Sequence, residues 1–536
     1  MSPNPAKAQK GLFVLPDGTN LMFTFILVSS LFLLWGVCNG MIDVMDKHFQ
    51  DELHLTKSQS AWVQFAHYLG YFLMSIPAGW LASKLGYKGG IITGLLIVAL
   101  GGFWFIPATH INALVQDGQV SPSTAFVAFL VGVCAIATGL TFLETIANPY
   151  TTVLGPKQFA ATRINLAQSC NGIGWIFGPI IGSVYFYSKN AAGQSTGSQT
   201  LYIPYMGVAI VVLVLAAIFF FAKVPDIKSD DEYHLDENAA ANGTEEREIP
   251  RRLVYMLLLL NSTVLIFACG MIVWVALQTV GLPESTLNAI MWAGGVISVG
   301  VAAVLLVPAA RNITHHSIWS HPHFAGATVT QFFYVAAQAG IFSFFINYMT
   351  AEVPAIPNSL SAGWLHDWFE MGKDGLMHIS DKGASTLASV GFFCFLAGRF
   401  SGAGILKKFP AHKVLGTYGL INVLVCLTVF LKLGWISVVA VFLSYFFMSI
   451  MFPTIFALGI HGLGARAKKA SSFIVMAIMG GAILPKLMGL VADKYDMSRG
   501  FIVPMFCFAF VAFYGFQWPK FSKSETMGRV PVSAGH

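Results

Sequence analysis

The chain has 536 residues, of which 56% are hydrophobic and only 10% carry a charge. This composition excludes an ordinary soluble globular protein and is typical of a protein with many membrane spans. The net charge of +6 comes from Lys and Arg residues spread over many short loops, so we expect no nucleic-acid partner. All seven cysteines fall within apolar runs, so we expect no disulfide framework.

Apolar runs long enough to cross about 30 Å of hydrocarbon recur along the chain. The polar segment before residue 21 has no apolar core or cleavage site, so we expect the first run to direct membrane insertion. A first series lies near residues 21–44, 60–82, 88–108, 124–150, 165–187 and 202–222. Two more runs follow near 253–280 and 287–309, and a second series lies near 326–349, 384–403, 412–431, 435–458, 470–491 and 500–518. The pattern predicts fourteen transmembrane helices.

The loops between these runs differ in charge. With the amino terminus in the cytoplasm, most of the 31 Lys and Arg residues fall in cytoplasmic loops, so we expect both termini to be cytoplasmic. We expect residues 225–252 to be a flexible acidic linker and residues 351–383 to be a long outer loop with an aromatic interfacial helix or lid near 364–369. The predicted domains are an N-terminal six-helix bundle (1–224), the linker (225–252), two inserted transmembrane helices (253–310) and a C-terminal six-helix bundle (311–536).

Two acidic residues lie deep in apolar runs. Asp43 lies at the end of the first run and Glu144 near the end of the fourth. A carboxylate at such a depth costs on the order of 3 kcal/mol to insert. A low dielectric favours the neutral form of the carboxyl, which can therefore bind a proton and release it when the surroundings change. These residues are candidate proton or substrate sites, and the alternative is a pair of structural carboxylates that lock helices together.

Repeated sequence at equivalent places is typical of transporters. GWLASK (79–84) and GLVADK (489–494) each end the second helix of a three-helix group, and GRF (398–400) falls at the corresponding place in a third. Longer blocks resemble the fucose permease branch of the major facilitator superfamily, which contains proton-coupled L-fucose and glucose/galactose transporters. These blocks are LWGVCNGMID (34–43), GYFLMSIPAGWLASKLGYKGGIITGL (70–95), LETIANPYTTVLGP (143–156), RINLAQ (163–168), FFYVAAQAGIFSFFINY (332–348), GRFSG (398–402), SIMFPTIFALGI (449–460) and SSFIVMAIMGGAI (471–483).

The resemblance implies an all-α polytopic membrane protein with the major facilitator fold. Two six-helix bundles would surround a central cavity and work by alternating access, here with two extra helices between them. The resemblance also places the functional acids of the family on Asp43 and Glu144. Our hypothesis is that Asp43 takes up a proton from outside and that Glu144 links protonation to the sugar hydroxyls.

A sugar site needs amides for paired hydrogen bonds and an aromatic face for the ring. The candidate amides are Asn39, Gln64, Asn165, Gln168, Gln338 and Asn347, and the candidate aromatics are Trp35, Tyr334 and Phe452. Simple packing and hydrogen bonding between helices are the alternative for each of them.

Two features depart from the fucose permease pattern. Gly40 and Ile42 stand where that pattern has further Asn residues beside the first-helix Asp, which weakens the case for L-fucose. Lys486 follows Pro485 at a depth where the family block is apolar. It is a possible charge partner for Asp43, a ligand for an anionic substrate or a substitute for a coupling cation. The alternative is a side chain that extends to the outer headgroups.

Two further segments carry no expected transport role. His315, His316, His321 and His323 form an HHxxxxHPH pattern in a cytoplasmic loop without the Cys or carboxylate spacing of a metal site, so we expect no metal and no cofactor. The inserted helices have no buried charge, and we expect them at the periphery.

The sequence therefore predicts a proton-coupled symporter of a neutral monosaccharide such as fucose, glucose or galactose. We expect a monomer in the cytoplasmic (inner) membrane of a bacterium, with a sugar, a proton and the lipid bilayer as its partners. The open alternatives are a sodium-coupled or uncoupled sugar carrier and a carrier of an acidic sugar that uses Lys486. A membrane-embedded glycosyltransferase is a remote alternative, because its catalytic carboxylates would lie in an outer loop rather than within spans.

Overall fold

The computed structural model describes residues 12–14, 18–53, 55–116, 118–155, 160–187, 197–225, 249–278, 284–314, 317–355, 368–372, 375–406, 408–461, 463 and 467–522. Its first group of helices is α1 (Met22–Asp43), α2 (Met45–Glu52), α3 (Lys57–Ser60), α4 (Trp62–Gln116), α5 (Pro122–Val153), α6 (Ala160–Tyr185), α7 (Gly197–Thr200) and α8 (Tyr202–Phe221). We call this group the N-terminal half.

The helices α10 (Arg251–Gln278) and α11 (Glu284–Arg311) come next in the chain. The C-terminal half follows, with η2 (Ile318–Ser320), α12 (Pro322–Ser343), α13 (Phe345–Ala351), α14 (Asp381–Leu406), α15 (Ala411–Phe430), α16 (Trp435–Met448), α17 (Met451–Ile460), α18 (Ala467–Met476), η6 (Ala477–Met479), α19 (Gly480–Lys494), α20 (Met497–Gly500) and α21 (Ile502–Ser522).

Most of the long helices are apolar on all sides, as expected for segments that cross a bilayer. Among the described residues, ten helices are long and apolar enough to span a membrane, or eleven if the bent pair α12–α13 counts as one span. All fourteen predicted segments fall on helices, and two of them, 60–82 and 88–108, lie within α4. Gly86 interrupts α4 with a φ of 70°, which a side chain would strain, so the chain bends between these two segments.

The segment predicted as a long outer loop contains the only strands in the described residues. β1 (Phe369–Met371) and β2 (Met377–Ile379) pair antiparallel. The prediction of an interfacial helix near 364–369 is therefore wrong at Phe369, which is the first residue of a strand. Residues 364–367 lie outside the described part. The acidic linker lies outside it as well, over 226–248.

Each half begins with a helix that is interrupted after 22 residues. α1 ends at Asp43, Val44 breaks the helix, and the eight residues of α2 follow. α12 ends at Ser343, Phe344 breaks the helix, and α13 follows with a bend of 45°. Val44 and Phe344 have nearly the same backbone angles, with φ of −94° in both. The two halves thus repeat one local structure, as expected for a duplicated transporter.

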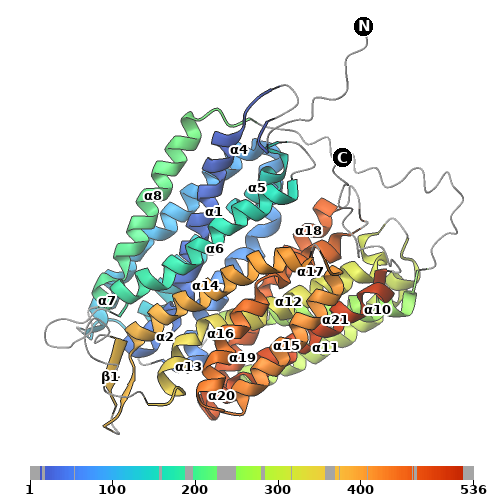
Figure 1. Cartoon of the computed structure of the whole chain (residues 1–536). Helices are drawn as coiled ribbons and strands as arrows, with labels where there is room; N and C mark the ends of the chain where they lie inside the picture. The colour runs from blue at the N-terminus through green and yellow to red at the C-terminus, as the bar shows by residue number, and fades with distance from the viewer. Residues whose placement is uncertain are drawn as a thin grey trace, which may run out of the picture.

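The two halves meet along two seams. α6 packs against α14 on one side, and α19 packs against α3 and α4 on the other. Figure 1 shows α2, α13 and α20 at one end of the molecule and α18 towards the opposite end; α18 also packs against α4 of the N-terminal half. We call the first of these the α3 end, because the short helix α3 lies there in contact with α19.

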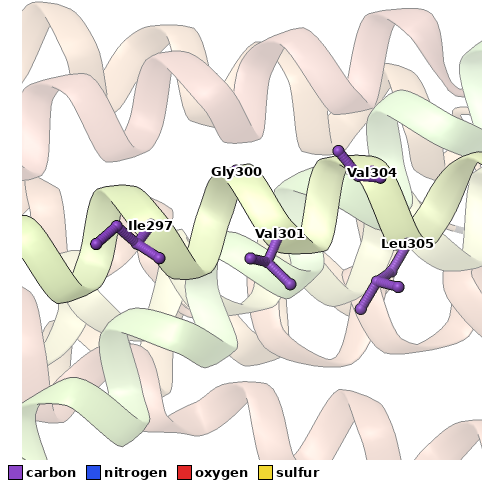
Figure 2. Close-up of a pocket in the computed structure, with 5 residues that line it drawn as sticks. All are labelled: Ile297, Gly300, Val301, Val304 and Leu305. Atoms are coloured by element: carbon purple, nitrogen blue, oxygen red, sulfur yellow. The ribbon is translucent and has the colours of Figure 1, made fainter.

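α10 and α11 lie beside the C-terminal half, where α10 packs on α12 and on α11 (Figure 1). A shallow groove of about 400 Å³ runs along the exposed face of α11 (Figure 2). Its lining residues are Ile297, Gly300, Val301, Val304 and Leu305. Since none of these side chains is polar, the groove has no group that would orient a sugar, and it is an apolar surface of the kind that lipid covers.

Candidate functional site

Asp43 is buried at the interruption between α1 and α2, with 4% of its surface exposed. Gln64 of α4 is fully buried and donates a hydrogen bond from Nε2 to Oδ1 of Asp43 at 3.3 Å. Oδ2 of Asp43 has no hydrogen-bond partner among the described residues. A buried carboxylate with one weak amide donor and no cation is unstable in its charged form, so this position favours a bound proton.

Asp46 is a further buried acid, which the sequence analysis missed. It lies on α2, one helical turn after Asp43, and its exposed fraction is 0%. Within the described part of the chain, neither carboxylate oxygen has a hydrogen-bond partner. The first predicted span ends at residue 44, so the sequence-based prediction assigned Asp46 to the outer loop that follows it. Its spacing of three from Asp43 was the available signal, because residues i and i+3 share one face of a helix.

Glu144 lies on α5 with 5% of its surface exposed, and its Oε2 has no hydrogen-bond partner in the residues described. Tyr71 of α4 and Glu144 face each other, and Trp35 of α1 faces Tyr71 on its other side. The Tyr71 hydroxyl and the Trp35 indole nitrogen are buried without completed hydrogen bonds. These polar atoms are in place to bind a ligand hydroxyl or water beside Glu144.

One face of α4 connects the two predicted acids. Gln64 bonds to Asp43 at one end of this face, and Tyr71 faces Glu144 two turns later. Between them lies His67, buried and with ring centroids 4.9 Å from Tyr68 and 5.1 Å from Tyr71. Because positions 64, 67, 68 and 71 recur at helical spacing, the four side chains form a continuous polar and aromatic stripe.

The structure brings some of the predicted sugar ligands close to these acids and places others elsewhere. Trp35 and Gln64 lie beside the acids, and Asn39 is buried on α1 with its Oδ1 unpartnered in the described residues. Tyr334 uses its hydroxyl to donate to the backbone oxygen of Met448 at 3.0 Å. Phe452 packs against Tyr334, with ring centroids 6.5 Å apart.

The remaining predicted amides have varied positions. Gln168 donates to Oδ1 of Asn148 at 3.0 Å, and its backbone oxygen accepts from Arg399 of α14 at 3.2 Å. Gln338 is half-buried on α12. The side chain of Asn165 lies outside the described residues. Asn347 lies on α13 and exchanges hydrogen bonds with Gln50 of α2, so it joins the two halves instead of facing Glu144.

Polar contacts between the halves lie along α6 and α14, where Ser385 and Ser389 donate to backbone oxygens of α6, and also at the α3 end. Besides Asn347 and Gln50, Lys47 of α2 lies 3.7 Å from Asp381 of α14. The backbone N–H of Lys57 donates to Oδ1 of Asp493 at 3.0 Å. The Nζ atom of Lys486 lies 3.5 Å from the centroid of the Trp62 ring, across the seam between α19 and α4. These contacts hold the α3 end closed.

Described polar contacts join the histidine-rich loop to the C-terminal half, among them the hydrogen bond that the Tyr514 hydroxyl donates to the backbone oxygen of His323 at 2.8 Å. The Nε2 atom of His323 lies 2.8 Å from the backbone oxygen of His461. The rings of His321 and His323 are 5.6 Å apart. His315 and His316 lie outside the described residues. The contact of His323 is that of a structural side chain at the start of α12.

Comparison with known proteins places the chain among membrane transporters. A family model described as Major Facilitator Superfamily matches residues 19–337. The L-fucose-proton symporter of Escherichia coli K12 is 31% identical over 504 residues, which cover 91% of each chain. A glucose/galactose transporter of Brucella abortus is 26% identical and covers 92% of this chain and 94% of its own length.

The fold also matches solved structures. The crystal structure of a Major Facilitator Superfamily transporter, FucP, in the outward conformation aligns with a TM-score of 0.56 at 30% identity. The alignment covers 93% of this chain and 99% of that one. An inward open structure of the xylose transporter XylE from E. coli aligns with the same TM-score at 10% identity, which supports the fold alone.

Proposed function

We propose that this chain, which belongs to the Major Facilitator Superfamily, is a proton-coupled symporter of a neutral monosaccharide that works by alternating access. The predicted resemblance to the fucose permease branch is confirmed, and the chain is a transporter and not an enzyme. The relatives named for L-fucose and for glucose and galactose support a hexose or deoxyhexose as the substrate class.

The observation that carries the proposal is the link between Asp43 and Glu144 along one face of α4. Both acids are buried without a cation partner among the described residues, so each favours a bound proton. The stripe of Gln64, His67, Tyr68 and Tyr71 joins them with side chains that a sugar or a water chain can contact. A sugar bound against Trp35 and Tyr71 would therefore interact with the protonated form of Glu144 differently from the ionised form, which is what coupling requires.

We further propose fourteen spans in a six, two and six arrangement, with the domain boundaries given by the sequence. Both termini then lie in the cytoplasm of a bacterium, in its inner membrane, and the α3 end faces outside. On that orientation, the contacts between Lys47, Lys57, Lys486 and their partners belong to a state that is closed to the outside. Asn347 is then a residue of the outer closure rather than of the sugar site.

Uptake by purified protein in proteoliposomes tests the proposal. We expect accumulation of a labelled sugar after an inward pH jump, with hexoses and deoxyhexoses screened against uronic acids. Accumulation driven by an inward sodium gradient at constant pH would instead favour a sodium-coupled carrier. Uptake that equilibrates without accumulation under both gradients would favour an uncoupled carrier, and transport of uronic acids only would favour the acidic-sugar alternative.

A further inference from the structure

We propose that Asp46 is a third proton-binding group of the coupling site, beside Asp43 and Glu144, and that it must be neutral before the α3 end can close. The proposal rests on the proposed proton coupling. The Asp46 carboxylate would take one proton from the outer solution and become a carboxylic acid. It would return that proton to water when the α3 end opens.

The first observation is the contrast between the place of Asp46 in the sequence and its place in the fold. α2 carries several polar residues and follows the predicted span, yet Asp46 is completely buried and its neighbour Asp51 is exposed. A carboxylate loses several kcal/mol of hydration on full burial unless a cation or several donors replace the water. Among the residues described, no cation pairs with Asp46 and neither of its oxygens completes a hydrogen bond, so a proton is the remaining means of neutralisation.

The second observation is a buried hydroxyl from the other half. Ser343, the last residue of α12, faces Asp46. Its exposed fraction is 0%, and its Oγ atom has no hydrogen-bond partner among the described residues. Asp46 and Ser343 come from the equivalent helix interruptions of the two halves, at Val44 and Phe344. Their approach exists only while the two halves are together at this end, so closure itself removes water from Asp46.

The other titratable groups around Asp46 do not neutralise it. Asp43 comes from α1 and is a second acid, which makes a negative charge on Asp46 less favourable. Tyr68 of α4 and Tyr187 after α6 are phenols in the same surroundings, and Tyr187 donates to the backbone oxygen of Val44 at 2.6 Å. Lys57 of the adjacent α3 donates to Asp493 and Ala492 of the C-terminal half.

Closure at the α3 end can be measured without any sugar. We would attach spin labels at Gln59→Cys and Tyr495→Cys, two exposed positions on opposite halves, in a background with the native cysteines replaced by Ser. In the wild type, the fraction with the short distance should rise as the pH falls. In Asp46→Asn, which resembles the protonated acid, that fraction should already be high at alkaline pH, with a midpoint raised by at least about one pH unit.

Two variants separate titration from packing. Asp46→Glu keeps an acid and should retain a pH-dependent distance. Asp496→Asn removes a carboxylate at the same end but keeps the N-cap of α20, and among the described residues the Asp496 carboxylate forms its ion pair with Lys432 of the same half. It should follow the wild-type pH curve. An Asp46→Asn curve that coincides with the wild type, or loss of pH dependence in Asp46→Glu, would overturn the proposal. The pH-jump uptake of the wild type tests the proposed function separately.

Discussion

The helix interruptions at Val44 and Phe344 have similar backbone angles, but the residues around the first are acidic and those around the second are uncharged. Asp43 and Asp46 lie one residue before and two residues after Val44, whereas Ser343 and the apolar Ile346 hold the equivalent positions around Phe344. Glu144 also lies in the N-terminal half, so all three buried acids of the candidate site belong to that half. From the C-terminal half, the uncharged Ser343 faces Asp46. A fold with two similar halves can therefore carry its buried acids in one half only.

Glu144→Gln should have the largest effect on this division of roles. The amide keeps the shape of the side chain but cannot exchange a proton, so pH-driven accumulation should fall to equal sugar concentrations on both sides. Exchange of labelled sugar at equilibrium should remain measurable, because it needs no net proton movement. Uptake and exchange assays in proteoliposomes measure both, with Asp496→Asn as the control at a half-buried carboxylate of the C-terminal half. Retained accumulation in Glu144→Gln would contradict the coupling role.

Asp43→Asn should have the next largest effect. Wild-type sugar binding should weaken as the pH rises and the buried acid loses its proton, because only the protonated form is stable in the closed site. The variant should keep its sugar affinity across that pH range while pH-driven accumulation is lost. Calorimetric titration with the transported sugar at several pH values measures the affinity. An unchanged pH dependence would return Asp43 to the role of a structural carboxylate that locks helices.

Lys47→Ala should weaken closure of the α3 end without removing an acid. The side chain of Lys47 is 18% exposed and bridges Asp51 of its own helix and Asp381 of the other half. Partly exposed ion pairs contribute about 0.2–1 kcal/mol, which corresponds to at most about a fivefold change in the closed population. The distance between the two spin labels measures this change.

A matched control and a rescue sharpen that test. Lys432→Ala removes a cation that pairs with Glu352 and Asp496 within the C-terminal half, so it should leave the closed population unchanged. The charge swap Lys47→Asp with Asp381→Lys should restore part of the closure that Lys47→Asp alone loses. Equal effects of Lys47→Ala and Lys432→Ala would show that the contact between halves has no special role.

Lys486→Gln should have the smallest effect on transport. Its ammonium lies over Trp62 at the seam, and such a contact contributes about 0.5–2 kcal/mol to holding the halves together. Uptake of a neutral sugar should stay within about twofold of the wild type, and Trp62→Ala should change closure in the same direction. Loss of all uptake in Lys486→Gln, with normal uptake in Trp62→Ala, would instead assign Lys486 to an anionic substrate.

Local properties of the sequence were sufficient to predict the long apolar helices and two of the buried acids. Hydropathy is a property of about 20 consecutive residues, and the insertion cost of Asp43 and Glu144 follows from the apolar residues beside them. The family resemblance followed from ordered blocks in both halves. For the same reason, the predicted helices coincide with those of the structure, whereas the outer loop, which has no such pattern, formed a hairpin at Phe369.

Tertiary structure alone decided which polar residues meet. Asp46 is polar among polar neighbours, and it is buried because α2 packs near α12, some 300 residues further along the chain. Asn347 and Lys486 have side chains of the kind that bind substrates, but they contact Gln50 and Trp62 of the opposite half. Contacts between residues so far apart in the sequence depend on how the two halves pack against each other. The hydropathy, charge and residue spacing within either half do not determine that packing.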